Sequence, residues 1–183
     1  MISLETLSAL FQNHSAALKT PIAQLEFDGK LFSRPALMGT VNLSRDSTYR
    51  ESIAISTEAA IRKSRVCFAQ GADLIDIGAE SSTAKAARVH APDQIRALVP
   101  VIEQLSADGI PVSAETYEPE VVKACLQAGA KVLNFTGNEY EAEILDLASE
   151  FNATVVMCYV GGANVREITD LNLDADPVPA LAA

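Results

Sequence analysis

Polar side chains recur in this chain at the points where short hydrophobic segments end. Asn42, Glu80, Glu115 and Asn134 stand at or just beyond four such ends. If the segments are parallel strands, their carboxyl ends meet at one rim, where α/β proteins place their chemistry. A carboxylate accepts hydrogen bonds from N–H groups, whereas a side-chain amide both donates and accepts them. This combination predicts a site for a small, polar, flat ligand.

The overall charge narrows the classes of partner. The 183 residues include 24 acidic and 14 basic side chains, which give a formal net charge of −10. Such a field repels nucleic acid and anionic membranes, and no basic stripe offsets it. We therefore expect a small-molecule partner, with neither nucleic acid nor a membrane bound.

Cysteine usage and hydropathy indicate a compartment. Cys67, Cys125 and Cys158 are widely spaced and form no Cys-x-x-Cys pair. An odd number of cysteines in a chain of this size points to reduced thiols in a cytosol. No signal peptide is visible, and no apolar run approaches the ~20 residues that cross a bilayer. We expect a cytoplasmic protein.

The elements that would position the rim residues follow from the pattern after residue 36. Hydrophobic runs alternate there with amphipathic helical stretches, which is typical of a parallel sheet. The strand candidates are 37–43, 73–79, 110–116, 131–136 and 154–160. Pro92 and Pro119 stand at expected helix starts, and Gly129 at a helix end. Asn138 with Glu141 predicts a capping box for a further helix.

The first 34 residues follow a different pattern. Residues 4–18 have the spacing of a helix, and 23–32 resemble a β-hairpin with Asp28-Gly29 in a type I′ turn. We interpret 1–34 as a cap on a single domain, 35–168 as its βα units, and 169–183 as a tail.

The number of strands predicts the fold class. A closed (β/α)8 barrel needs eight strands and typically ~250 residues, whereas about five βα strands fit this sequence. The expected fold is therefore α/β, a partial (β/α)8 barrel. Such a chain is either a fragment of a longer protein or a half-barrel with two exposed parallel edges. We favour the fragment, because exposed edges invite pairing or aggregation.

Four motifs at the predicted strand ends carry a family resemblance. They read MGTVNLSRDST at 38–48, DIGAESSTAK at 76–85, SAETY at 113–117 and LNF at 133–135. In combination they resemble the motifs of the dihydropteroate synthase family, the pterin-binding TIM barrels of folate biosynthesis. The similarity runs from about residue 24 to residue 162.

The resemblance implies a function and a set of site residues. It implies that a pterin pyrophosphate binds and that its methylene group is transferred to an aromatic amine such as p-aminobenzoate. Glu115 and Asn134 would bind the pterin ring, and Asn42 would help to hold a Mg²⁺ ion on the pyrophosphate. The implied substrate-binding loops contribute Ser82, Thr83 and Arg45. An oligomer is compatible with the family, although its interface helices are not in this chain.

The sequence also departs from the family pattern. Glu115 stands where an Asp is usual, and Met157-Cys158 where a Met-His pair is usual. The family's Thr-Arg-Pro-Gly segment reads Ser82-Thr83-Ala84-Lys85, so its Arg is absent. Some of the cationic side chains in the rim loops would then replace that Arg; the candidates are Arg45, Arg50, Lys85 and Arg88.

Several alternatives remain open at the level of the sequence. The protein is either a transferase whose 183 residues are incomplete for catalysis, or a non-catalytic pterin- or phosphate-binding relative. A third reading is the methyltetrahydrofolate-dependent methyltransferase branch of the same superfamily. Asn42 could instead organise the following loop through an Asx-turn. Asp76 is expected inside the barrel, where it needs hydrogen-bond partners.

Overall fold

A single parallel sheet organises the chain. The computed structural model describes residues 3–19, 25–27, 29–160 and 162–167. The sheet and its helices follow the order β3 (Met38–Asn42), α3 (Thr57–Ala69), β4 (Leu74–Gly78), α4 (Ala91–Ala107), β5 (Val112–Thr116), α5 (Pro119–Gln127), β6 (Val132–Phe135), α6 (Glu141–Glu150) and β7 (Thr154–Met157). The five strands are neighbours in sequence order, and each pair is parallel. The predicted alternation is confirmed.

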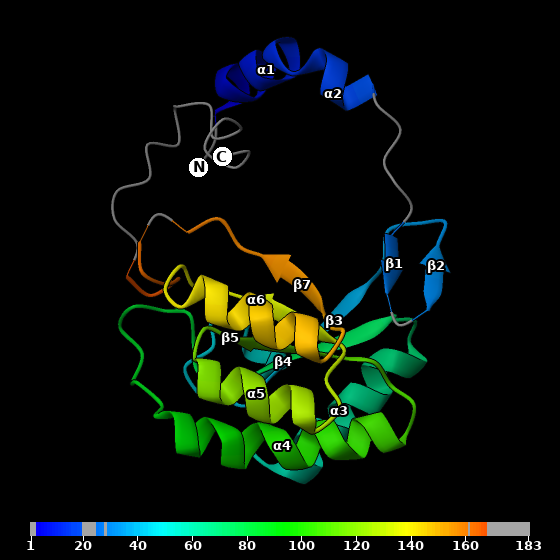
Figure 1. Ribbon diagram of the computed structural model, residues 1–183, viewed down its shortest axis with the longest axis vertical. Coiled ribbons are helices and arrows are strands. Elements are labelled where there is room, and N and C mark those ends of the chain that lie inside the picture. Colours follow the sequence, from blue (N-terminus) through cyan, green and yellow to red (C-terminus); the bar gives the residue numbers. More distant parts are fainter. Residues whose placement is uncertain (1–2, 20–24, 28, 161, 168–183) are drawn as a thin grey trace.

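The two faces of the sheet differ because successive side chains of a strand point to opposite sides. One face packs against the helices α3 to α6 (Figure 1). Its side chains form the main core, and they include Val41, Ile75, Ile77, Ala114, Leu133 and Phe135. The opposite face carries the polar side chains of the strand ends. Because the helices cover the apolar face, these polar side chains lie on the side of the sheet away from the helices.

A hairpin covers the amino-terminal end of that polar face. It consists of β1 (Leu25–Phe27) and β2 (Lys30–Phe32), which pair antiparallel with Phe27 opposite Lys30. Gly29 has a φ of +70°, as the predicted turn requires, whereas Asp28 lies outside the described residues. Phe32 packs with Leu74 and Val132 in a small second core.

The amino-terminal helix is interrupted. Instead of one helix over 4–18, the chain forms α1 (Leu4–Asn13) and α2 (Ser15–Lys19). α1 buries no residue and exposes Leu4, Leu7 and Phe11, and it lies away from the sheet (Figure 1). That the first 34 residues cap the domain stays a prediction.

Most predicted helix boundaries are correct, but one is wrong. α4 has Pro92 in its first turn, and α5 begins at Pro119. The capping box of α6 does not form: Tyr140 is the N-cap, at a φ of 60°, and no side chain caps the helix. The Asn138 N–H instead donates to the Ala163 carbonyl at 2.8 Å. This contact with a distant segment holds Asn138 away from the helix end.

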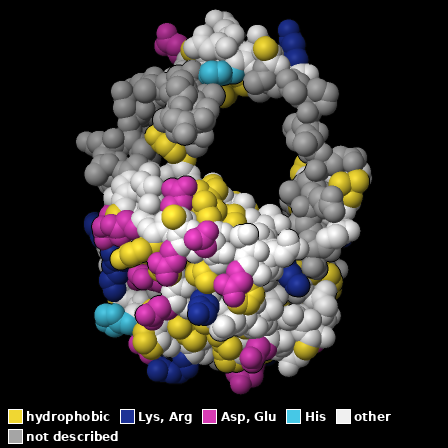
Figure 2. Space-filling model, in the orientation of Figure 1, with side chains coloured by type: hydrophobic (Ala, Val, Ile, Leu, Met, Phe, Trp, Pro, Cys, Tyr) yellow, Lys and Arg dark blue, Asp and Glu magenta, His cyan; other side chains and the backbone are white. Residues whose placement is uncertain are grey.

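The surface agrees with the net charge of −10. Acidic side chains are spread over the visible face of the helical body, and no band of basic residues crosses it (Figure 2). Within the described ranges, no helix combines the length and the apolar character that crossing a bilayer requires.

Candidate functional site

The register of the sheet brings the predicted strand-end residues into one row. Asn42 is opposite Gly78, Gly78 is opposite Glu115, and Glu115 is opposite Asn134. Residues paired in this way across parallel strands lie on the same face, about 4.8 Å from one strand to the next. The side chains of Asn42, Glu115 and Asn134 therefore share the polar face, at the carboxyl ends of their strands.

A buried carboxyl group lies one step below this row. Asp76 is 5% exposed, and its Oδ1 accepts a hydrogen bond from the Ser113 hydroxyl at 2.6 Å. Its Oδ2 accepts one from Asn134 Nδ2 at 3.3 Å. Burial raises the pKa of Asp76, and these two hydrogen bonds act against the rise. The expectation that Asp76 needs partners inside the barrel is confirmed.

Asn134 is oriented by the groups around it. Its Nδ2 donates to Asp76, and its Oδ1 accepts from the Cys158 thiol at 3.5 Å. Each end of the amide can make one more hydrogen bond, because an amide carries two N–H groups and its oxygen two lone pairs. A ligand on this face would therefore meet both a donor and an acceptor at Asn134.

Glu115 extends over a glycine. A Cβ added at Gly78 would lie 2.7 Å from Glu115 Oε2, so the absence of a side chain there makes room for the longer carboxylate. Within the described part of the chain, no hydrogen bond reaches this carboxyl group. Burial, and secondarily the charge of Asp76, raise the pKa of Glu115 from 4.5 to about 7. Glu115 can therefore gain or lose a proton near neutral pH.

Asn42 organises the loop that follows β3. Its Nδ2 donates to the hydroxyls of Ser47 at 3.0 Å and Ser52 at 2.7 Å, and its backbone carbonyl accepts from the Ala54 N–H at 2.8 Å. Among the described residues its Oδ1 has no hydrogen-bond donor. Asn42 thus organises the loop through its Nδ2 group and not through the Asx-turn considered from the sequence, which would use Oδ1 as the acceptor. That oxygen is left for a ligand.

A cationic pocket lies on the rim beside this loop. Its volume is about 270 Å³, and Arg45, Arg50, Thr83 and Lys85 line it together with Asp46. The described structure shows no ion pair for the three cationic side chains. Arg45 and Thr83, both predicted to bind substrate, thus share one pocket. Ser82 instead lines a separate small cavity that includes Glu115.

Arg88 does not line the cationic pocket, unlike the other three candidate cations; it lines a neighbouring pocket with Tyr117 and Glu167. Its guanidinium donates to the Tyr117 hydroxyl and to Glu167, and it lies 3.9 Å from Glu80. The two carboxylates, Glu167 and Glu80, offset its positive charge.

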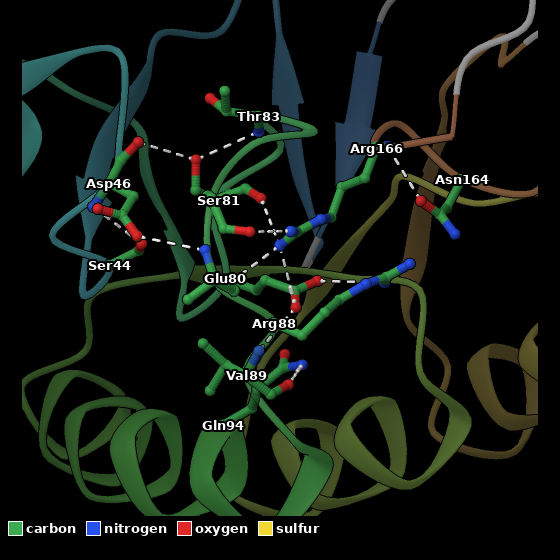
Figure 3. Close-up of polar contacts among 12 residues, drawn as sticks. Ser44, Asp46, Glu80, Ser81, Thr83, Arg88, Val89, Gln94, Asn164 and Arg166 are labelled. Atoms are coloured by element: carbon green, nitrogen blue, oxygen red, sulfur yellow. Dashed lines mark hydrogen bonds and ion pairs between the residues drawn. The ribbon is translucent and has the colours of Figure 1, made fainter.

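Arg166 is a residue that the sequence pattern did not indicate. It lies after β7, and its side chain is 3% exposed. Its Nη1 forms an ion pair with Glu80 Oε1 at 3.1 Å. Figure 3 shows the Arg166 side chain directed toward the loop after β4. One feature of the sequence could have indicated such a residue. Glu80 follows a buried strand, and a carboxylate buried there needs a cationic partner.

A family model for pterin binding enzymes matches residues 38–178. The chain belongs to the pterin binding enzyme family. Dihydropteroate synthase from Synechocystis is 32% identical over 155 residues, which cover 82% of this chain and 53% of that protein. The enzyme from Staphylococcus haemolyticus is 30% identical over 130 residues. The chain spans about half the length of these two curated relatives, 53% and 49%.

Solved structures of this pterin binding enzyme family share the fold. Dihydropteroate synthase of Xanthomonas albilineans with 4-aminobenzoic acid gives a TM-score of 0.65 at 33% identity, over 76% of this chain and 52% of that one. The Burkholderia cenocepacia enzyme complexed with 7,8-dihydropteroate gives 0.67 at 26% identity, over 81% and 50%. The partial (β/α)8 barrel and the family predicted from the sequence are both confirmed.

Proposed function

We propose that this chain binds a reduced pterin on the polar face of its sheet and acts in a dihydropteroate-synthase-like reaction. The observation that carries the proposal is the row of Asn42, Glu115 and Asn134 on one face of the sheet. The 2-amino-4-oxo edge of a pterin presents N–H donors and a carbonyl acceptor. An ionised Glu115 accepts from the donors, and the Asn134 amide offers both functions beside it.

The reaction proposed is transfer of the pterin methylene group to an aromatic amine such as p-aminobenzoate. The bond between the methylene carbon and the pyrophosphate oxygen breaks, and its electron pair leaves with the pyrophosphate. The amine lone pair then forms the new C–N bond, and the amine nitrogen loses a proton. Glu115 and Asp76 lie where negative charge would stabilise the cation that develops on the pterin.

Mg²⁺ fits this site as an ion bound mainly by the substrate. In the described ranges, no three His, Cys, Asp or Glu side chains gather as a metal site. Mg²⁺ commonly takes one or two protein ligands and completes its shell with phosphate and water. Asn42 Oδ1, which accepts no hydrogen bond from the described residues, would be one such ligand. When bound, the ion would neutralise charge on the leaving pyrophosphate.

Titration with a reduced pterin tests the proposal. We expect Glu115→Ala to weaken pterin binding about 10- to 100-fold, because a charge-assisted hydrogen bond contributes about 1.5–3 kcal/mol. Isothermal titration calorimetry measures the change. Glu103→Ala, which removes an exposed carboxylate from α4, is the matched control and should bind as the unaltered chain does. Equal affinity of all three proteins would refute the assignment of Glu115.

A second prediction concerns the cationic pocket. We expect Arg45→Ala, Lys85→Ala to lower the affinity for inorganic pyrophosphate about tenfold at low salt, since these side chains line the pocket and form no ion pair with any described residue. Arg62→Ala, Lys123→Ala removes the same charge from exposed helix positions and controls for the general field. If both double variants bind pyrophosphate equally well, the pocket has no specific role.

A non-catalytic pterin-binding relative is the second candidate, favoured by the Glu at position 115 and by the missing loop Arg. The two candidates differ in turnover. Formation of dihydropteroate from pterin pyrophosphate and p-aminobenzoate supports the transferase. Pterin binding without product, in this chain and in the product of any longer reading frame that contains it, supports the binding protein.

A further inference from the structure

We propose that Arg166 is a positioning residue that holds the rim segment 81–89 in one conformation beside the carboxyl ends of β4 and β5. The segment contains Ser82, Thr83 and Lys85, so the consequence for ligands rests on the proposed function. The structural part of the proposal rests on the contacts of Arg166 alone.

The guanidinium of Arg166 contacts the segment at both of its ends. Nη1 donates to the Ser81 carbonyl at 3.1 Å and to the Ala87 carbonyl at 3.2 Å, and Nη2 donates to the Ala86 carbonyl. One planar, five-donor group therefore joins the beginning and the end of the segment (Figure 3). A lysine ammonium is a point charge and does not reproduce this fork.

Glu80 completes the attachment from the β4 side. Its side chain is 7% exposed and pairs with Arg166 at 3.1 Å. The same carboxylate accepts hydrogen bonds from the Val89 N–H at 2.8 Å and from the Tyr117 hydroxyl. Burial and the neighbouring Glu80 raise the pKa of Tyr117, which keeps this hydroxyl protonated as a donor.

Arg166 is itself fixed to the sheet by its flanking residues. The Val165 N–H donates to the Thr136 carbonyl at 3.0 Å, just beyond β6, and the Asn138 N–H donates to Ala163 at 2.8 Å. Asn164 Oδ1 accepts from the Arg166 N–H at 3.0 Å. The rim segment is thus attached through Arg166 to the end of β6, two strands away from β4.

This attachment has a consequence for binding. Segment 81–89 contains no helix or strand, so without Arg166 its backbone would have to be ordered when a ligand binds. That ordering cost would reduce the affinity of any ligand held by the segment. A ligand held by the sheet face alone, through Glu115 and Asn134, would be affected much less.

Hydrogen exchange tests the structural part without any ligand. In Arg166→Met we expect the Ala86 and Val89 amides, which are hydrogen-bonded in the segment, to exchange at least tenfold faster. The β5 amides should be unchanged. Arg166→Lys keeps the charge beside Glu80 and should still lose protection in the segment. Arg65→Met, which breaks an ion pair with Asp108, should leave the segment as it was.

Ligand titration separates a positioning role from a general structural one. Arg166→Met should lower the affinity for inorganic pyrophosphate about tenfold and change that for a reduced pterin less than twofold. If the single variant fails to fold because Glu80 is left buried and unpaired, Glu80→Gln, Arg166→Met replaces it in both measurements. Unchanged exchange in the segment, or equal losses for both ligands, would overturn the proposal. If the unaltered chain binds neither ligand, the proposed function fails, while the exchange result still decides the role of Arg166.

Discussion

Raising the pH from about 5 to about 8 should destabilise this protein by about 2–3 kcal/mol through Glu115 alone. The folded protein holds the pKa of Glu115 at about 7, against an ordinary value of 4.5. Between these values the folded state binds more protons than the unfolded state, so stability falls as the pH rises. The full contribution is present below about pH 4.5 and is lost as the pH rises through about 7. Denaturant unfolding across this range measures the change.

Glu115→Gln is the control, because glutamine resembles the protonated carboxyl group. The variant should match the unaltered chain near pH 5 and be more stable by about 2–3 kcal/mol near pH 8. The raised pKa of Asp76 acts in the same direction but persists in the variant, and the pKa of the nearby Cys158 thiol is raised by burial. Parallel stability curves for the two proteins would show that Glu115 is not buried as described.

The same proton links stability to ligand binding. If the pterin N–H groups donate to ionised Glu115, binding must displace its proton near neutral pH. Pterin affinity should therefore rise as the pH increases from about 6 to about 8, and the variant Glu115→Gln should not show this rise. The buried carboxylate of Glu115 thus lowers folding stability near neutral pH, and hydrogen bonds from a bound pterin would offset this cost.

Gly78→Ala should weaken pterin binding at least tenfold while leaving the fold intact. The new Cβ would lie 2.7 Å from Glu115 Oε2, which is the far end of a flexible side chain. Glu115 can move without disturbing the core, but its carboxylate then leaves the position that faces the ligand. Titration with a reduced pterin, together with a thermal unfolding curve, measures both effects.

Gly39 lies on the helix-facing side of the sheet, and Gly39→Ala should show the opposite pattern, with lower stability and unchanged binding. Its Cβ would lie 3.1 Å from Ile75 and 3.2 Å from Cys67, both in the helix-facing core. We expect a loss of about 1–2 kcal/mol in stability with unchanged pterin affinity.

A compensating variant tests the steric argument for Gly78. Adding Glu115→Asp to Gly78→Ala shortens the carboxylate and should restore part of the binding. Full pterin affinity in Gly78→Ala would disprove the steric argument.

Local patterns were sufficient to predict the elements and part of the site. Hydrophobic runs of strand length, with proline and glycine at the helix ends, predicted the parallel sheet, because these features act on neighbouring backbone. Once the strands are parallel, polar residues at their carboxyl ends must lie at one rim. The placement of Asn42, Glu115 and Asn134 on one face follows from this rule, and the register confirms it.

Only the tertiary structure decided which polar groups are paired. Arg88 and Arg166 look alike in the sequence as loop arginines, and both lie beside Glu80, but the Arg166 side chain is buried whereas that of Arg88 is half-exposed. Asn138 has the local signature of a helix cap but bonds to Ala163 instead. Burial and pairing depend on which distant segments are packed together, and burial also sets the pKa of Glu115. No spacing within one segment contains that information.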